Sequence, residues 1–180
     1  IECRGPDSKI IKSDLDSNIK YCFIFNRLSI LDLSENANQP MINEHSGNQI
    51  MFNGEIYNHS ELRSMLSNKG VDFKTNHSDT EVILKGLEYE GLSFISKLRG
   101  QFSIFYFDIK LNRAYLIRDR LGQKPLYYYH DKKNLLFSSN LESLIKSNNN
   151  LSRIKESSLN EYLRYGVVAA PRTIFEDYNK

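Results

Sequence analysis

An Asn-Gly-Glu sequence at residues 53–55 is the first candidate for chemistry, because it follows an apolar run at residues 49–53. The run predicts a strand that ends at Gly54. A glycine there lets the backbone approach a ligand closely, so that the Asn53 amide and the Gly54 N–H can both donate to one oxygen, as an oxyanion hole requires. Asn-Gly is also the commonest hairpin turn. The pair by itself therefore leaves both interpretations open.

Arg27 is the second candidate, because it interrupts two apolar runs, Tyr21–Phe25 and Leu28–Leu33, that predict buried strands. An arginine between buried strands needs a carboxylate partner. That partner can be an acid of the protein, or the α-carboxylate of an amino-acid ligand, which a guanidinium grips with two parallel hydrogen bonds. An internal salt bridge and a ligand clamp are the two alternatives.

Asp79 is the third candidate and lies where a helix should begin. Ser78 and Glu81 have the spacing of a capping box, which predicts a helix after Ser78. A carboxylate in the first turn interacts favourably with the helix dipole. It can instead face the ammonium group of a ligand, so a structural and a binding role are again both open.

The densest group of charges lies at residues 118–128, where Arg118-Asp119-Arg120 precedes Gly122 and a strand led by Pro125. Alternating charges at a turn are typical of a solvated or salt-bridged loop. Taken alone, this segment therefore indicates structure rather than ligand binding.

The elements that must position these residues change type along the chain. Period-two apolar runs predict further strands, at residues 102–107, 114–117, 126–129 and 135–138. Helical periodicity predicts helices that begin at Ser60 and after Ser78, and others at residues 92–98, 141–146 and 158–165. Strands, helices, strands and helices in this order favour an α+β fold of hairpin-rich sheets with helices outside them.

Composition excludes several classes of protein. A chain of 180 residues can bury a core without disulfides or metals. The net charge of +2, without a basic run, argues against a nucleic-acid partner, and the apolar runs are too short to span a membrane. Two cysteines, Cys3 and Cys22, make no disulfide framework and favour a reducing, cytoplasmic setting. We expect Cys22 to be a core residue on its strand.

Taken together, the motifs resemble the N-terminal domain of glutamine-hydrolysing asparagine synthetases, a class II glutamine amidotransferase domain. They are, in order, Arg4-Gly5-Pro6-Asp7, Arg27-Leu28-Ser29-Ile30, Asn53-Gly54-Glu55-Ile56-Tyr57-Asn58, Ser78-Asp79-Thr80-Glu81 and residues 118–128. Residues 98–102 and 165–175 are similar too, so the resemblance covers nearly all of residues 1–180. The form Lys124-Pro125-Leu126-Tyr127-Tyr128 points to the asparagine synthetase branch.

The resemblance implies a fold and a reaction. The fold is the N-terminal-nucleophile type, a four-layer αββα sandwich with two antiparallel sheets. The reaction is hydrolysis of L-glutamine to glutamate and ammonia, which passes to aspartate activated by ATP in a synthetase domain. No cofactor is expected in the present domain, whereas ATP and Mg²⁺ belong to the synthetase domain. The expected partners are L-glutamine and that domain, with a homodimer of the full enzyme as a further option.

The resemblance also assigns roles to individual residues. Arg27 clamps the α-carboxylate of glutamine, and its side of the pocket is lined by backbone groups of Leu28, Ser29, Ile30 and Leu31. Asn53 and the Gly54 N–H hold the oxyanion of the tetrahedral intermediate. Glu55 and Asp79 receive the α-ammonium group.

The beginning of the chain departs from the family pattern. The family's nucleophile is a cysteine at the mature N-terminus, on a short strand before the Arg4–Asp7 motif, but only three residues precede Arg4 here. Cys3 stands where the family usually has His, so we do not assign it as the nucleophile. We expect the nucleophile, the first strand and the synthetase domain to lie outside residues 1–180. A related amidotransferase with another ammonia acceptor and a non-catalytic glutamine-binding module are the alternatives.

We predict that the 180-residue chain releases no ammonia from glutamine, because no residue in it is assigned as the nucleophile. An enzyme-coupled ammonia assay with millimolar glutamine checks this, with Cys3→Ser as the matched control. Glutaminase activity that is lost in the Cys3→Ser variant would show that Cys3 does act as the nucleophile.

Overall fold

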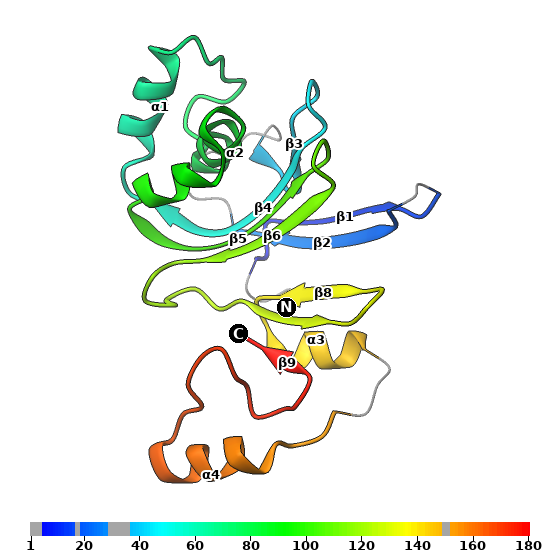
Figure 1. Cartoon of the computed structure of the whole chain (residues 1–180). Coiled ribbons are helices and arrows are strands. Elements are labelled where there is room, and N and C mark those ends of the chain that lie inside the picture. Colours follow the sequence, from blue (N-terminus) through cyan, green and yellow to red (C-terminus); the bar gives the residue numbers. More distant parts are fainter. Residues whose placement is uncertain (1–4, 17–18, 29–36, 149–151) are drawn as a thin grey trace. The chain divides into compact units, whose positions relative to one another are not determined.

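Strands that are far apart in the sequence form a four-stranded antiparallel sheet (Figure 1). Its order is β3 (Met41–Ile42), β4 (Gln49–Ile56), β5 (Gly100–Asp108) and β6 (Arg113–Arg118). The structure is a computed structural model that describes residues 5–16, 19–28, 37–148 and 152–180. The chain divides into two compact units, residues 1–123 and 124–180, and each is described by itself.

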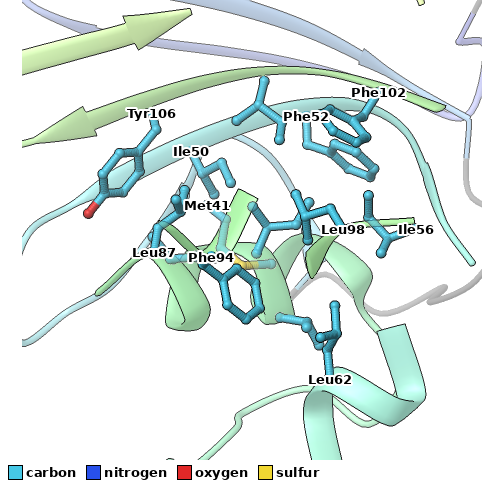
Figure 2. Close-up of a cluster of buried hydrophobic side chains, with 14 of the residues drawn as sticks. Met41, Ile50, Phe52, Ile56, Leu62, Leu87, Phe94, Leu98, Phe102 and Tyr106 are labelled. Atoms are coloured by element: carbon cyan, nitrogen blue, oxygen red, sulfur yellow. The ribbon is translucent and has the colours of Figure 1, made fainter. Parts of the chain in front are cut away.

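Helices cover one face of this sheet. They are α1 (His59–Ser67), α2 (Asp79–Glu90) and the 3₁₀ helix η3 (Gly91–Lys97). Figure 2 shows the apolar core between sheet and helices, where side chains of β4 meet those of the helical segment. Because side chains alternate along a strand, the same face of β4 supplies Ile50, Phe52 and Ile56 to this core.

A two-stranded antiparallel sheet, β1 (Ser8–Asp14) with β2 (Tyr21–Arg27), belongs to the same unit. The Phe23 ring of β2 packs against the Phe105 ring of β5, with 5.1 Å between the ring centroids. Phe105 alternates with Ile104, a core residue, so this contact lies on the face of β5 opposite the helices. β2 therefore contacts the second face of the four-stranded sheet.

The second unit holds a three-stranded antiparallel sheet in the order β8 (Leu135–Ser138), β7 (Tyr127–His130) and β9 (Tyr178–Asn179). Helices α3 (Leu141–Ser147) and α4 (Glu156–Tyr165) complete it. Tyr178 is almost fully buried, and its ring contacts the rings of Tyr129 and Phe175. Packing of these aromatic side chains holds the short C-terminal strand in place.

The α+β class and the antiparallel sheets predicted from the sequence are confirmed. The predicted helix after Ser78 is also confirmed, since the Ser78 hydroxyl accepts from the Glu81 N–H at 3.3 Å. The reciprocal half of the capping box is absent, because the Glu81 carboxylate accepts from the N–H groups of Lys74 and Thr75 instead. Among the described residues, none of the helices is long and apolar enough to cross a membrane.

Several predicted boundaries were wrong. The first helix begins at His59 with Asn58 as its N-cap, not at Ser60, and α4 begins at Glu156 rather than Ser158. The strands β1, β3 and β9 were not predicted, because β3 and β9 have only two residues and β1 is largely exposed. The strand predicted at residues 28–33 lies outside the described residues, apart from Leu28.

The prediction that Cys22 is a core residue was also wrong. Cys22 lies on β2, as expected, but it is exposed. It alternates with Phe23, which is buried against the four-stranded sheet, so its side chain projects from the other face. The apolar run Tyr21–Phe25 therefore forms a half-buried strand, not a fully buried one.

We predict that Gly86→Ala destabilises the first unit, although alanine is normally favoured in a helix. A Cβ at Gly86 would lie 2.1 Å from the ring of Phe94, which is fully buried and cannot move aside. Overpacking of this kind costs about 1–3 kcal/mol in the free energy of unfolding. Urea unfolding measures the loss, and the double variant with Phe94→Leu should recover part of it. Full stability of Gly86→Ala alone would contradict this packing.

Candidate functional site

The register between β4 and β5 determines where the Gly54 N–H points. Phe102 of β5 is paired opposite Gly54. Both backbone groups of Phe102 face Asp119: its N–H donates to the carboxylate at 3.2 Å, and its carbonyl accepts from the Asp119 N–H at 2.8 Å. Gly54 and Phe102 are therefore a non-hydrogen-bonded pair of the antiparallel ladder. The Gly54 N–H consequently points away from β5, to the opposite edge of β4.

The N–H groups of Phe52 and Ile56 point to the same edge as that of Gly54. Each of these residues is two positions from Gly54, and the direction of the N–H alternates from one residue of a strand to the next. Side chains accept both of them. The Phe52 N–H donates to Gln39 Oε1 at 2.6 Å, and the Ile56 N–H donates to Asp79 Oδ2 at 3.2 Å. The strand β3 pairs with β4 only at Gln49 and Ile50. The Gly54 N–H thus lies between the Gln39 side chain and the Asp79 carboxylate.

Gly54 is inside β4 and is not part of a turn, so the hairpin interpretation of Asn53-Gly54 was wrong, as was the strand end expected at Gly54. Only glycine fits at this position, because a Cβ would lie 2.1 Å from the Gln101 carbonyl oxygen. Gly100, opposite Ile56, is equally restricted by the Glu55 carbonyl oxygen. These two close approaches hold the end of β4 against the beginning of β5.

Asn53 and Glu55 lie on the opposite face of the sheet from the helices, because they alternate with Phe52 and Ile56. Both are partly exposed, and both are paired with residues of β5. Their side chains share this face with Phe105, which contacts β2. Asn53, Gly54 and Glu55 are therefore adjacent, but the two side chains project from a face of the sheet while the Gly54 N–H lies at its edge.

Arg27 ends β2 and is buried, with an exposed fraction of 8%. Its Nη1 donates to Asn38 Oδ1 at 2.7 Å. Asn38 is followed by Gln39, so two consecutive residues connect the guanidinium to the edge of β4. Leu28 is described and largely exposed. The other residues expected to line this side of the pocket, Ser29, Ile30 and Leu31, lie outside the described residues.

Asp79 is buried in the first turn of α2, as the sequence predicted for a helix start. Burial raises the pKa of its carboxyl above the ordinary value, although hydrogen bonds from the Ile56 and Thr80 N–H groups act against that rise. The neighbouring Thr80 Oγ1 accepts from Gln39 Nε2 at 3.3 Å. Asp79 therefore combines a place at the helix N-terminus with a place at the edge of β4.

Residues 118–123 form the loop that anchors Phe102. Asp119 Oδ1 accepts from the N–H groups of Leu121 and Gln123, and Arg118 Nη2 donates to the Gly122 carbonyl at 2.7 Å. This part of the charged segment is structural, as the sequence indicated. Its Asp119 is mostly buried, however, and fixes the β5 register on which the direction of the Gly54 N–H depends.

Sequence reasoning missed Asn38 and Gln39. They lie in a segment that showed only polarity and a following Pro40, which is typical of any loop. No local pattern marks them, because their partners, Arg27, Phe52 and Thr80, are 11 to 41 residues away. Only the folded chain brings them together.

Two further features of the described chain lie apart from the edge of β4 or hold no ligand set. Within the described part of the chain, no group of three His, Cys, Asp or Glu side chains could hold a metal ion. An open surface hollow is lined by His45, residues 71–74 and three residues of α2, Lys85, Glu88 and Tyr89. None of the residues predicted from the sequence lines it, so the candidate site remains the edge of β4.

Similarity in structure gives the fold. Phosphoribosylpyrophosphate amidotransferase of Bacillus subtilis matches 59% of this chain and 25% of its own, with a TM-score of 0.50 and 21% sequence identity. At this identity the likeness concerns the fold alone. The chain has the fold of an N-terminal-nucleophile-type amidotransferase, which confirms the fold expected from the resemblance.

Similarity in sequence gives the family. Residues 1–180 match the glutamine amidotransferase domain family, and the chain belongs to that family. It is 44% identical to the glutamine-hydrolysing asparagine synthetase 2 of Bacillus subtilis over 80% of this chain, and 39% identical to asparagine synthetase 1 of that organism over 95%. The chain spans only 18% and 26% of the length of these relatives. The resemblance based on the motifs is thereby confirmed.

Asp79→Asn should stabilise the protein at neutral pH. Because burial raises the folded-state pKa of Asp79 above its ordinary value of 3.8, the carboxyl holds its proton more readily in the folded chain. The free energy of unfolding therefore falls as pH rises from 3.8 through the folded-state pKa, and this loss persists at pH 7. The amide variant avoids this loss, so we expect its unfolding midpoint at pH 7 to be higher than that of the wild type.

Thermal unfolding of wild type and variant between about pH 3 and pH 7 checks this. The difference should vanish at low pH, where the wild-type carboxyl is protonated in both states. A variant that is less stable than wild type at pH 7 would show that the carboxylate mainly stabilises the helix N-terminus.

Proposed function

We propose that residues 1–180 bind L-glutamine at the edge of β4 as the glutaminase domain of an asparagine synthetase. The observation that carries the proposal is the Gly54 N–H, which points out of the sheet between Gln39 and the Asp79 carboxylate. A backbone N–H in this position can donate to the oxyanion that forms when a nucleophile attacks the side-chain amide. Membership of the glutamine amidotransferase domain family supports the choice of glutamine.

The charges near this edge suit a free amino acid. The Arg27 guanidinium, held by Asn38, can grip the α-carboxylate with two parallel hydrogen bonds. Asp79, with Glu55, receives the α-ammonium group. A cation therefore faces the carboxylate and acidic groups face the ammonium, so the site is complementary in sign to each charged group of the ligand.

The spacing along β4 also suits glutamine. The N–H groups of Gly54 and Ile56 are two residues apart, which is about 7 Å along a strand. Asp79 sits at the Ile56 N–H, so a ligand with its ammonium near Asp79 places its side-chain amide near Gly54. Glutamine has two methylenes with which to bridge this distance, whereas asparagine has one. We therefore expect glutamine to bind more tightly than asparagine.

In the proposed reaction, a cysteine thiol attacks the amide carbon of glutamine and its proton passes to the amide nitrogen. The tetrahedral intermediate then collapses to a thioester as the C–N bond breaks and ammonia leaves. Water then releases glutamate from the thioester. Gly54 N–H and Asn53 stabilise the oxyanion in both steps. We assign no nucleophile within residues 1–180, and none of the described residues is needed to hold a metal.

The wider function is proposed from the names of the two relatives described above, both of which are glutamine-hydrolysing asparagine synthetases. In this proposal, ammonia passes to a synthetase domain, where ATP and Mg²⁺ activate aspartate. The full enzyme acts in the cytoplasm, and a homodimer is a further option. The free Cys22 thiol is compatible with a reducing setting. A related amidotransferase with another ammonia acceptor, and a non-catalytic glutamine-binding module, remain the alternatives. Assaying the longer enzyme for asparagine formation from aspartate separates the first alternative from the proposal.

Arg27→Lys tests the proposed pocket. Lysine keeps the charge but cannot form two parallel hydrogen bonds, so we expect glutamine affinity to fall by about tenfold or more. Nitrogen-15 NMR titration of the 180-residue chain with L-glutamine measures this through the Gly54 amide shift, with L-asparagine as the ligand control. Arg113→Lys, at an exposed position on β6, is the matched protein control. No response of the wild-type Gly54 amide at millimolar glutamine would sink the proposed function.

A further inference from the structure

We propose that Asn38 and Gln39 are the positioning residues of this site, and that their neutral amides are required for glutamine binding. The inference rests on the proposed function and adds to it two residues that contribute no charge to the ligand.

Gln39 joins the edge of β4 to the start of α2. Its side chain is buried, with an exposed fraction of 7%. The amide oxygen accepts from the Phe52 N–H at 2.6 Å, and the amide nitrogen donates to Thr80 Oγ1 at 3.3 Å. Since Thr80 follows Asp79, Gln39 sets the distance between the strand that carries Gly54 and the helix turn that carries the carboxylate.

Gln39 also decides which N–H group is presented to a ligand. Phe52, Gly54 and Ile56 direct their N–H groups to the same edge. Gln39 accepts from the Phe52 N–H and Asp79 accepts from the Ile56 N–H, so the Gly54 N–H is the donor that lies between them. If the Phe52 N–H were unoccupied, a ligand oxygen could bind two residues away from the intended position, beyond the reach of Asp79.

Asn38 orients the group proposed to bind the α-carboxylate. Its Oδ1 accepts from Arg27 Nη1 at 2.7 Å, which restrains one end of the guanidinium. Because Asn38 and Gln39 are consecutive, their Cα atoms are about 3.8 Å apart. The orientation of Arg27 and the spacing between Gly54 and Asp79 are therefore set by the same short segment.

The amide groups matter because they form hydrogen bonds with charged and polar partners without adding a charge of their own. A carboxylate at residue 38 would still accept from Arg27, and would do so as a stronger, charge-assisted bond. It would also bring a negative charge next to the guanidinium, and this charge would repel the ligand carboxylate. A carboxylate at residue 39 could still accept from the Phe52 N–H, but it could not donate to Thr80, and it would repel the amide oxygen of a glutamine bound at the Gly54 N–H.

The test uses Asn38→Asp and Gln39→Glu in the 180-residue chain, because each changes an amide to a carboxylate of the same shape. Asn112→Asp, in an exposed turn, is the matched control. Nitrogen-15 NMR titration with L-glutamine gives the affinity from the Gly54 amide shift, and thermal unfolding gives the stability of each variant. We expect Asn38→Asp to unfold at or above the wild-type midpoint and yet to bind glutamine at least about tenfold more weakly.

A purely structural role would not separate affinity from stability in this way. The inference is overturned if both carboxylate variants fold and bind glutamine with an affinity within about twofold of wild type. Such a change is well below the expected tenfold loss of affinity, which corresponds to about 1.4 kcal/mol of binding free energy. If Gln39→Glu does not fold, Asn38→Asp decides alone, since its contact with Arg27 is retained. If wild type itself shows no response to glutamine, the proposed function fails and this inference fails with it, an outcome distinct from the first.

Discussion

The antiparallel register of β4 and β5 is the constraint on which the candidate site depends. A slip of one residue would reverse the edge to which the Gly54 N–H points and would bring the wrong face of β4 to the core. Two glycines oppose such a slip, because Gly54 and Gly100 each approach a carbonyl oxygen of the other strand more closely than a Cβ would permit. Asp119 adds to this by accepting from the Phe102 N–H on the far side of β5. A buried carboxylate in one loop thus controls the geometry of a different strand.

The site places buried charges beside neutral amides. Arg27 and Asp79 are both more than 90% buried, and the raised pKa of Asp79 shows that its charged form is disfavoured there. Asn38 and Gln39 satisfy hydrogen bonds around these groups without pairing their charges. Retaining an ionisable group in a position that penalises its charge is typical of sites kept for binding or catalysis rather than for stability.

The fold and the site were predictable to different degrees. The helix at Ser78, the hairpin-rich strands and the α+β class follow from local periodicity and capping, and they agree with the structure. The strand end expected at Gly54 was wrong, because pairing with β5 overrides the local preference of Asn-Gly for a turn. The burial expected for Cys22 was wrong for a related reason: the apolar run Tyr21–Phe25 does not tell which strand face meets another sheet.

The sequence by itself determined the family and nominated Arg27, Asn53, Gly54, Glu55 and Asp79, because residue types and their order along the chain carry that information. Only the tertiary structure decided that the Gly54 N–H leaves the sheet between Gln39 and Asp79, and that Asn38 holds Arg27. The physical reason is that the direction of an N–H in a strand depends on its pairing with a partner about 50 residues away. The contacts of Gln39 are likewise made across the fold, so no local pattern could have revealed them.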